Sequence, residues 1–135
     1  YDQFIKPCIP YAMRGATWYQ GEANAMNVAD AFAYEDNLTR LITGWRKAWG
    51  QGDYPFLFVQ LPRYKGPAWQ VIRESTLKVL RAVPNTGMAV TIDTGTAKNV
   101  HASDRAIVGG RLADWALCTV YKKTSIPCGP MYTSS

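Results

Sequence analysis

The sequence predicts an α/β fold in which a parallel β-sheet lies between layers of helices. Three apolar runs are typical of buried strands, and they cover residues 13–18, 55–61 and 87–93. Three longer segments carry apolar residues at helical spacing, and they cover residues 29–49, 68–83 and 103–121. Because strands and helices alternate along the chain, we expect the strands to pair in parallel, with helices on both faces of the sheet.

Length and composition favour one soluble globular domain. The chain has 135 residues, of which 47% are hydrophobic and 19% charged, enough for one core and unlike a disordered chain. The net charge is +5, but the basic residues are scattered and form no run interleaved with aromatic residues. We therefore predict no nucleic-acid partner. No apolar run approaches the roughly 20 residues that span a membrane, so we predict no membrane partner either.

The cysteines and the histidine give no metal-site pattern. Cys8, Cys118 and Cys128 form no CxxC pair, and His101 is the sole histidine. We expect neither a metal nor another cofactor. Cys118 could pair with Cys128, or Cys8 with either of them, and the sequence leaves these options open.

The first strand and helix follow from their apolar spacing. Residues 13–18 end in Trp18, and a short polar turn separates them from the helix predicted over 29–49. Glycines at positions 50 and 52 are expected to end that helix. Its apolar stripe consists of Tyr34, Leu38, Leu41, Ile42, Trp45 and Trp49.

The second strand is nearly continuously apolar, as in strands buried on both faces of a parallel sheet. Gln60 stands near its end and either faces a cleft or has its amide satisfied by backbone groups. The helix predicted over 68–83 has one apolar side and contains Arg73 and Glu74.

The third strand is predicted to end at Asp93, and a polar loop follows it. Ser103 is the expected N-cap of the last helix, with Asp104 in its first turn. That helix is apolar nearly all round, so we expect it to be well buried.

A polar turn follows the first strand, where α/β proteins commonly place their chemistry. Gly21 permits a positive φ or a close backbone approach, and Asn24 carries an amide with two donor hydrogens. A backbone N–H and a side-chain amide three residues apart can converge on one oxygen and stabilise negative charge on it. The alternative is an ordinary strand-to-helix turn, with Asn24 or Asn27 as the N-cap.

The stretch Gly-Ala-Thr-Trp-Tyr-Gln-Gly-Glu-Ala-Asn-Ala over residues 15–25 resembles the third sequence block of the sialate O-acetylesterase family. That family belongs to the SGNH hydrolases, whose third block is Gly-x-x-Asn, and Gly21 and Asn24 fall on its two positions. Ala23 stands where the family usually has serine. The resemblance implies that the Gly21 N–H and the Asn24 side chain form an oxyanion hole. It also implies substrate contacts from four other residues: Gln20, Glu22, Gln60 and Arg73.

The sequence around His101 resembles the family's last block. Asp-Thr-Gly at 93–95, Asn-Val-His at 99–101 and Val-Gly-x-Arg-Leu-Ala at 108–113 carry this likeness. This likeness implies that His101 is the general base. Its position in the chain alone is equally consistent with an ordinary surface histidine. Lys98 stands where SGNH hydrolases usually place an aspartate. Asn99 or Asp93 could orient the imidazole instead, or the site could be a Ser-His pair without a third member. For Asp93 the alternative is a structural acid at the strand end.

The resemblance covers nearly the whole chain but includes no serine nucleophile. Serines at positions 75, 103, 125, 134 and 135 all lack a Gly-x-Ser context, and in the family the serine belongs to an earlier block. We therefore expect residues 1–135 to be the C-terminal portion of a flavodoxin-like SGNH domain, incomplete at the N-terminus. The abrupt start at Tyr1 agrees with that expectation.

The implied activity is that of a carbohydrate esterase. It would remove O-acetyl groups from sialic acid or other acetylated glycans by serine-type hydrolysis, with an acetylated carbohydrate as its partner and with this portion inactive alone. Relatives of this kind are secreted, periplasmic or lysosomal. The competing prediction is a non-catalytic carbohydrate-binding or scaffold domain of the same fold. The sequence leaves the oligomeric state and the preferred sugar open.

Overall fold

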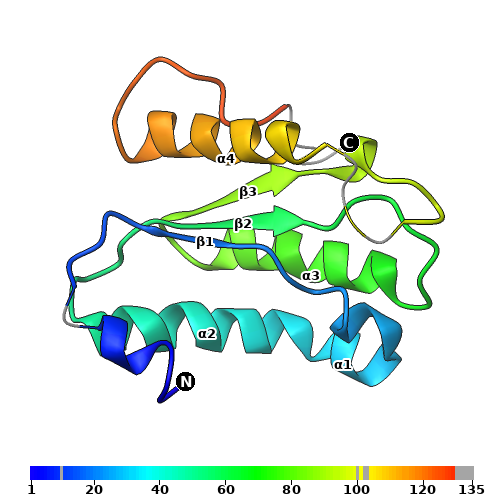
Figure 1. The fold of residues 1–135 in the computed structure, drawn as a ribbon, viewed down its shortest axis with the longest axis horizontal. Coiled ribbons are helices and arrows are strands. Elements are labelled where there is room, and N and C mark those ends of the chain that lie inside the picture. The colour runs from blue at the N-terminus through cyan, green and yellow to red at the C-terminus, as the bar shows by residue number, and fades with distance from the viewer. Residues whose placement is uncertain (10, 100, 102–103, 130–135) are drawn as a thin grey trace.

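The computed structural model describes residues 1–9, 11–99, 101 and 104–129 of the chain (Figure 1). Its centre is a parallel sheet in the order β1-β2-β3, formed by β1 (Ala16–Trp18), β2 (Phe56–Gln60) and β3 (Thr86–Val90). In register, Phe56 of β2 pairs with Ala16 on one side and with Thr86 on the other. The predicted parallel α/β fold is confirmed.

Helices cover both faces of this sheet, as predicted. Figure 1 shows α1 (Val28–Phe32), α2 (Tyr34–Trp49) and α3 (Trp69–Ala82) on one face and α4 (Arg105–Thr119) on the other. The two crossovers from β1 to β2 and from β2 to β3 step in the same direction. Because such crossovers are right-handed, both place their helices on the same face, and the chain changes face only after β3.

The central strand β2 is buried throughout its length, because helices cover both of its faces. Phe56 and Phe58 pack in the core shared with α2 and α3. Val59 points the other way and packs with Ala89 and Val108 under α4. This alternation of side chains along one strand is what gives a nearly continuous apolar run in the sequence.

The helix predicted over 29–49 is two helices. Ala33 separates α1 from α2, with φ −77° and ψ −8°. These angles stay in the right-handed region, so the break needs no glycine or proline and leaves no signal in the sequence. Asn27 caps α1, because its side chain accepts a hydrogen bond from the Asp30 N–H at 3.1 Å.

The third strand ends at Val90, so the prediction that it reaches Asp93 is wrong. Thr91 turns the chain into a short 3₁₀ segment, Ile92–Thr94. Its hydroxyl donates to the Gln60 carbonyl at 2.6 Å, and the Thr94 hydroxyl donates to the Thr91 carbonyl at 2.9 Å. Side-chain hydroxyls that bind nearby backbone in this way compete with a strand ladder.

Two predictions about the last helix are also corrected. Asp104 caps α4 by accepting from the N–H groups of Ala106 and Ile107, whereas Ser103, the predicted cap, lies outside the described residues. Val108 and Trp115 are buried against the sheet, but Ile107 is 41% exposed and Leu117 is 40% exposed. One helix packed on a sheet buries one side only, and no described element covers its outer side.

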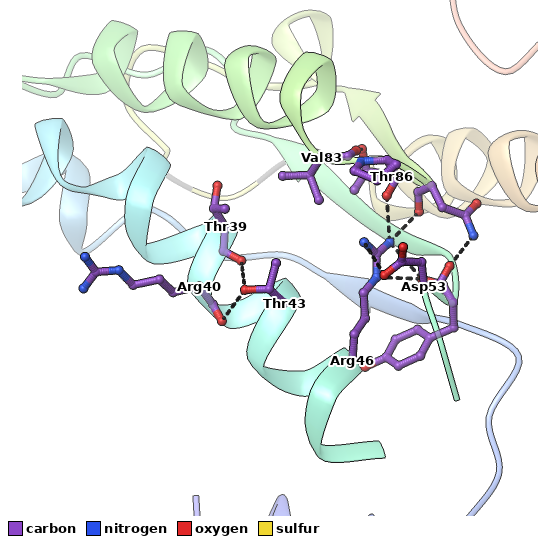
Figure 2. A network of polar contacts seen from close by, with 10 residues as sticks. Thr39, Arg40, Thr43, Arg46, Asp53, Val83 and Thr86 are labelled. Carbon is purple, nitrogen blue, oxygen red and sulfur yellow. Dashed lines mark hydrogen bonds and ion pairs between the residues drawn. The ribbon is translucent and has the colours of Figure 1, made fainter. Parts of the chain in front are cut away.

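A buried arginine ties together the loops at the amino ends of the strands (Figure 2). Arg46 of α2 is 5% exposed. Its guanidinium donates to the carbonyls of Tyr54, just before β2, and of Pro84 and Asn85, just before β3, over 2.9–3.1 Å. Asp53 lies 3.8 Å from Nη1. One side chain therefore holds a helix and the starts of two strands in place.

Gly87 allows α4 to pack closely on β3. A Cβ atom there would lie 2.6 Å from Trp115 Cε3 and 2.8 Å from Leu57 Cδ2. We expect Gly87→Ala to lower the free energy of unfolding by about 1–3 kcal/mol, the usual cost of overpacking a core. Urea denaturation of the 135-residue chain measures this. Gly44→Ala in α2, which would meet nothing within 4 Å, is the control and should be neutral or stabilising. Equal stability of the two variants would contradict the expectation.

All three cysteines are free thiols, so none of the disulfides left open by the sequence forms in this structure. Among the described residues, no helix is long and apolar enough to cross a membrane.

Candidate active site

Seven of the nine predicted site residues follow strands at the carboxyl end of the sheet. In Figure 1 the strand arrowheads point to the side where the loops after β1, β2 and β3 meet. Gln20, Gly21, Glu22 and Asn24 follow β1, and Asp93, Asn99 and His101 follow β3. Parallel strands bring their carboxyl ends to one edge of a sheet, which is where α/β proteins bind ligands.

Gly21 requires glycine for both its conformation and its surroundings. It has φ +140°, a value that L side chains rarely adopt. A Cβ atom would lie 3.1 Å from Ile72 Cγ2 and 3.3 Å from Leu61 Cδ1. Its carbonyl accepts from the Ala25 N–H at 2.9 Å. Gly21 is buried, and in the described part of the chain no acceptor meets its N–H.

Asn24 is held through its carbonyl oxygen. Gln20 Nε2 donates to Asn24 Oδ1 at 2.8 Å. Tyr34, the first residue of α2, donates from its hydroxyl to the Gln20 backbone carbonyl at 2.7 Å and lies 3.2 Å from Gln20 Oε1. Asn24 does not cap α1, since Asn27 does, and its Nδ2 meets no acceptor within the described residues.

His101 lies in a cleft of about 460 Å³ between the β1 loop and α4. Two charged side chains share this cleft, Glu22 from the loop after β1 and Arg105 from the first turn of α4. The other residues that line it are Tyr19, Val108, Gly109 and Leu112. The fold thus brings His101 together with Glu22, whose positions are separated by most of the chain.

The amide residues lie in a separate and smaller cavity. Gln20 and Asn24 line a space of about 80 Å³ together with Trp18, Tyr34 and α2 residues. Within the described residues, therefore, the turn after β1 divides its side chains. Tyr19 and Glu22 line the cleft that holds His101, whereas Gln20 and Asn24 line the smaller cavity beside α2.

Neither residue predicted to orient the imidazole hydrogen-bonds to it. Asn99 Oδ1 accepts from the backbone N–H of His101 at 3.1 Å and so orders the loop. Asp93 binds Arg111 of α4 through both carboxylate oxygens, at 2.6 and 2.5 Å. These hydrogen bonds from Arg111 hold the pKa of Asp93 below its ordinary value. In this structure Asp93 ties the loop after β3 to α4.

Gln60 and Arg73 lie away from the histidine cleft. Gln60 is 9% exposed, and its Nε2 donates to the Arg73 carbonyl in α3 at 3.0 Å. Of the two options for Gln60, the structure shows an amide satisfied by backbone. Its side chain borders a different cavity, of about 540 Å³, beside β3. Substrate contacts from Gln60 and Arg73 stay predictions.

Two residues of this region were not predicted from the sequence. Tyr34 counted only as a member of the apolar stripe of a helix, although a buried tyrosine hydroxyl usually finds a hydrogen-bond partner. Arg105 had no signal, because its place in the cleft depends on how α4 returns across the sheet. Among the described residues, no three or more His, Cys, Asp and Glu side chains gather as a metal site would require.

Comparisons with known proteins agree with this fold and indicate the family. Residues 1–118 match the family model described as carbohydrate esterase, sialic acid-specific acetylesterase. Sialate O-acetylesterases of Rattus norvegicus and Mus musculus are 27% and 29% identical to the chain over 93% of its length. The chain spans 27% of the length of each of these relatives.

Two solved structures are similar to this chain. The crystal structure of a carbohydrate acetylesterase from Xanthomonas citri superimposes on 99% of the chain with a TM-score of 0.92 and 36% identity, and the match covers 32% of that protein. A protein from Arabidopsis thaliana, 24% identical with a TM-score of 0.63 over 74% of the chain, shares the fold. Taken with the geometry of the turn after β1, the match to most of the chain shows that it belongs to the sialic acid-specific acetylesterase family of carbohydrate esterases.

Proposed function

We propose that this chain supplies an oxyanion hole and a general base to an esterase that removes O-acetyl groups from sialic acid or related acetylated glycans. The observation that carries the proposal is the turn after β1. There a positive-φ glycine and a neighbouring asparagine each keep a donor without an acceptor among the described residues. Such donors at the carboxyl end of a parallel sheet suit an oxygen that gains negative charge.

The chemistry assigns one task to each group. A serine hydroxyl attacks the acetyl carbonyl, and His101 takes the proton from that hydroxyl. The carbonyl oxygen becomes an oxyanion that accepts hydrogen bonds from the Gly21 N–H and Asn24 Nδ2. When the C–O bond to the sugar breaks, His101 returns its proton to the departing sugar hydroxyl. Water then releases acetate from the serine by the same steps.

The serine in this scheme comes from outside the 135 residues. Ser75 is 5% exposed within α3, and the Ser125 hydroxyl donates to Asp114 on α4 at 2.9 Å. Ser103, Ser134 and Ser135 lie outside the described residues. The matched relatives are more than three times as long as this chain. We propose that the chain is the C-terminal portion of the catalytic domain and that the serine precedes it.

The test begins with the coding DNA upstream of Tyr1. We expect the reading frame to continue into an apolar strand that ends in a serine turn. The complete protein should then release acetate from O-acetylated sialic acid, and replacement of that serine with alanine should abolish the release. The 135-residue chain alone, which is the control, should release none. A complete protein without such a serine, or one that releases no acetate from sialic acid or acetylated xylan, would overturn the proposal.

A second candidate is a non-catalytic carbohydrate-binding domain. The observation that favours it is that Asp93 and Asn99 are bound elsewhere, so no acid within the described residues hydrogen-bonds to the His101 imidazole. In this case sugar would change the tryptophan fluorescence of the complete protein, but acetate would not appear.

A further inference from the structure

We infer that Tyr34 and Gln20 are positioning residues that hold the Asn24 amide with its NH₂ group toward the reacting oxygen. The inference rests on the proposed function and extends it to a hydroxyl that does not touch the substrate. Its basis is a chain of hydrogen bonds that starts at α2, passes through the Gln20 side chain and ends at Asn24 Oδ1. We call these three residues the amide relay.

The first step of the amide relay is the Tyr34 hydroxyl. This residue is 4% exposed and starts α2, so the core fixes its ring. The hydroxyl donates to the Gln20 backbone carbonyl at 2.7 Å and lies 3.2 Å from Oε1 of the same residue. The hydroxyl has one proton, which points mainly to the backbone carbonyl and is shared with Oε1 in the longer contact. That shared proton favours the orientation of the Gln20 amide in which its oxygen, and not its NH₂ group, faces Tyr34.

The second step turns that rotamer into an orientation for Asn24. With Oε1 toward Tyr34, Gln20 presents Nε2 to Asn24 Oδ1 at 2.8 Å. A carboxamide that accepts through its oxygen directs its two N–H donors to the opposite side. Asn24 Nδ2 meets no acceptor among the residues described. The reversed pair of amides would instead point Asn24 Oδ1 at the oxyanion, where two electronegative oxygens would repel.

The amide relay does not depend on pH near neutrality. Burial raises the pKa of the Tyr34 hydroxyl to about 12, against a lowering by the nearby Trp18 side chain and with a smaller increase from the negative charge of Glu22. The hydroxyl therefore keeps its proton and its role as donor at neutral pH. The two amides do not titrate. The orientation of the Asn24 amide thus depends on the packing and hydrogen bonds of Tyr34 and Gln20. A single substitution at Tyr34 can therefore change it.

The kinetic test uses the complete enzyme and Tyr34→Phe, which removes one hydroxyl and keeps the ring. We expect kcat to fall about tenfold, as for the loss of one positioning hydrogen bond, with KM unchanged. Tyr54→Phe is the matched control, because the Tyr54 hydroxyl is buried with no partner among the described residues; it should keep full kcat. Comparison of the unfolding midpoints of both variants verifies that they are folded in the assay.

A double-mutant cycle separates positioning from general damage. Asn24→Ala alone should lower kcat by about 10²–10³-fold, as for the loss of an oxyanion donor. If Tyr34 acts only through Asn24, then adding Tyr34→Phe to Asn24→Ala should cause no further loss. A further tenfold loss in the double variant would overturn the inference. Full turnover of Asn24→Ala would instead overturn the proposed function, and the inference would fall with it.

A second measurement needs no catalysis and uses the 135-residue chain. Side-chain amide hydrogen exchange by NMR should show slow exchange for the Gln20 NH₂, which is bound to Asn24, and fast exchange for the Asn24 NH₂. In Tyr34→Phe, exchange of the Gln20 NH₂ should become faster, and Tyr54→Phe should leave it unchanged. A protected Asn24 NH₂ with a fast Gln20 NH₂ would mean that the amides are reversed and would overturn the inference while leaving the proposed function standing.

Discussion

Replacing His101 with glutamine in the complete enzyme is expected to lower kcat for acetate release by about 10⁴-fold, the upper end of the usual contribution of a general acid–base. Glutamine retains polarity and approximate size but cannot accept the serine proton or return it to the sugar. The place of His101 in the fold suits a catalytic role, because it lies in the cleft of about 460 Å³ that the loop after β1 also lines. KM should change little, because the imidazole acts on the proton rather than on substrate binding.

The measurement is acetate release by purified complete protein at saturating substrate. Asn99→Ala is the informative comparison, because Asn99 binds the His101 backbone and not its imidazole. It should loosen the loop and reduce turnover far less than His101→Gln does. Circular dichroism would establish that both variants are folded. If His101→Gln retained turnover close to that of the parent, His101 would not be the base and the serine-type scheme would fail.

No acid among the described residues hydrogen-bonds to the His101 imidazole. Asp93 is bound by Arg111, and Asn99 is used by the backbone. Glu22 is the carboxylate that lines the same cleft as the imidazole, although no hydrogen bond joins them. Under the proposed function, the described residues supply a base and two oxyanion donors. The match covers about a third of a carbohydrate acetylesterase from Xanthomonas citri, and we propose that the serine belongs to a part of the domain outside this chain.

Much of the fold could be predicted because its signals are local. The nearly continuous apolar run of β2 reflects helices on both of its faces, and the stripes of α2 and α3 reflect one buried side each. The predicted element boundaries were wrong where a residue far away in the sequence determines the local structure. The strand that was expected to reach Asp93 stops at Val90 because the Thr91 hydroxyl binds Gln60, and the outer side of α4 is exposed because no described element covers it.

In the candidate site, too, local features could be predicted and long-range contacts could not. Gly21 could be predicted, since a turn that needs φ +140° selects glycine by itself. The partners of Asp93 and Gln60 could not be predicted, because each depends on how a later helix packs on the sheet. Arg111 comes from α4 and the Arg73 carbonyl from α3. Tyr34 has the spacing of a core residue, and only its hydroxyl contact with Gln20, 14 positions earlier in the chain, reveals another role.

The largest loss of stability is expected from Arg46→Met, which should lower the free energy of unfolding by about 2–4 kcal/mol. Methionine fills the space of the aliphatic stem but cannot donate. The carbonyls of Tyr54, Pro84 and Asn85 would then each lose a charged donor that lies at 2.9–3.1 Å. The Asn85 carbonyl would keep the hydrogen bond from the Phe56 N–H at 3.1 Å, whereas the carbonyls of Tyr54 and Pro84 have no other donor among the described residues. Buried acceptors left without a partner are costly, and bonds to a charged donor are stronger than neutral ones.

Three comparison variants identify the cause of that loss in urea denaturation of the 135-residue chain. Arg46→Lys should restore little, because an ammonium cannot reach the starts of two strands as a planar guanidinium does. Asp53→Asn should cost less than about 0.5 kcal/mol, since Asp53 is 69% exposed and 3.8 Å from Nη1. Lys47→Met, an exposed neighbour in the same helix turn, should change stability equally little. If Arg46→Met were no less stable than Lys47→Met, the guanidinium would not be what holds the loops before β2 and β3 to α2.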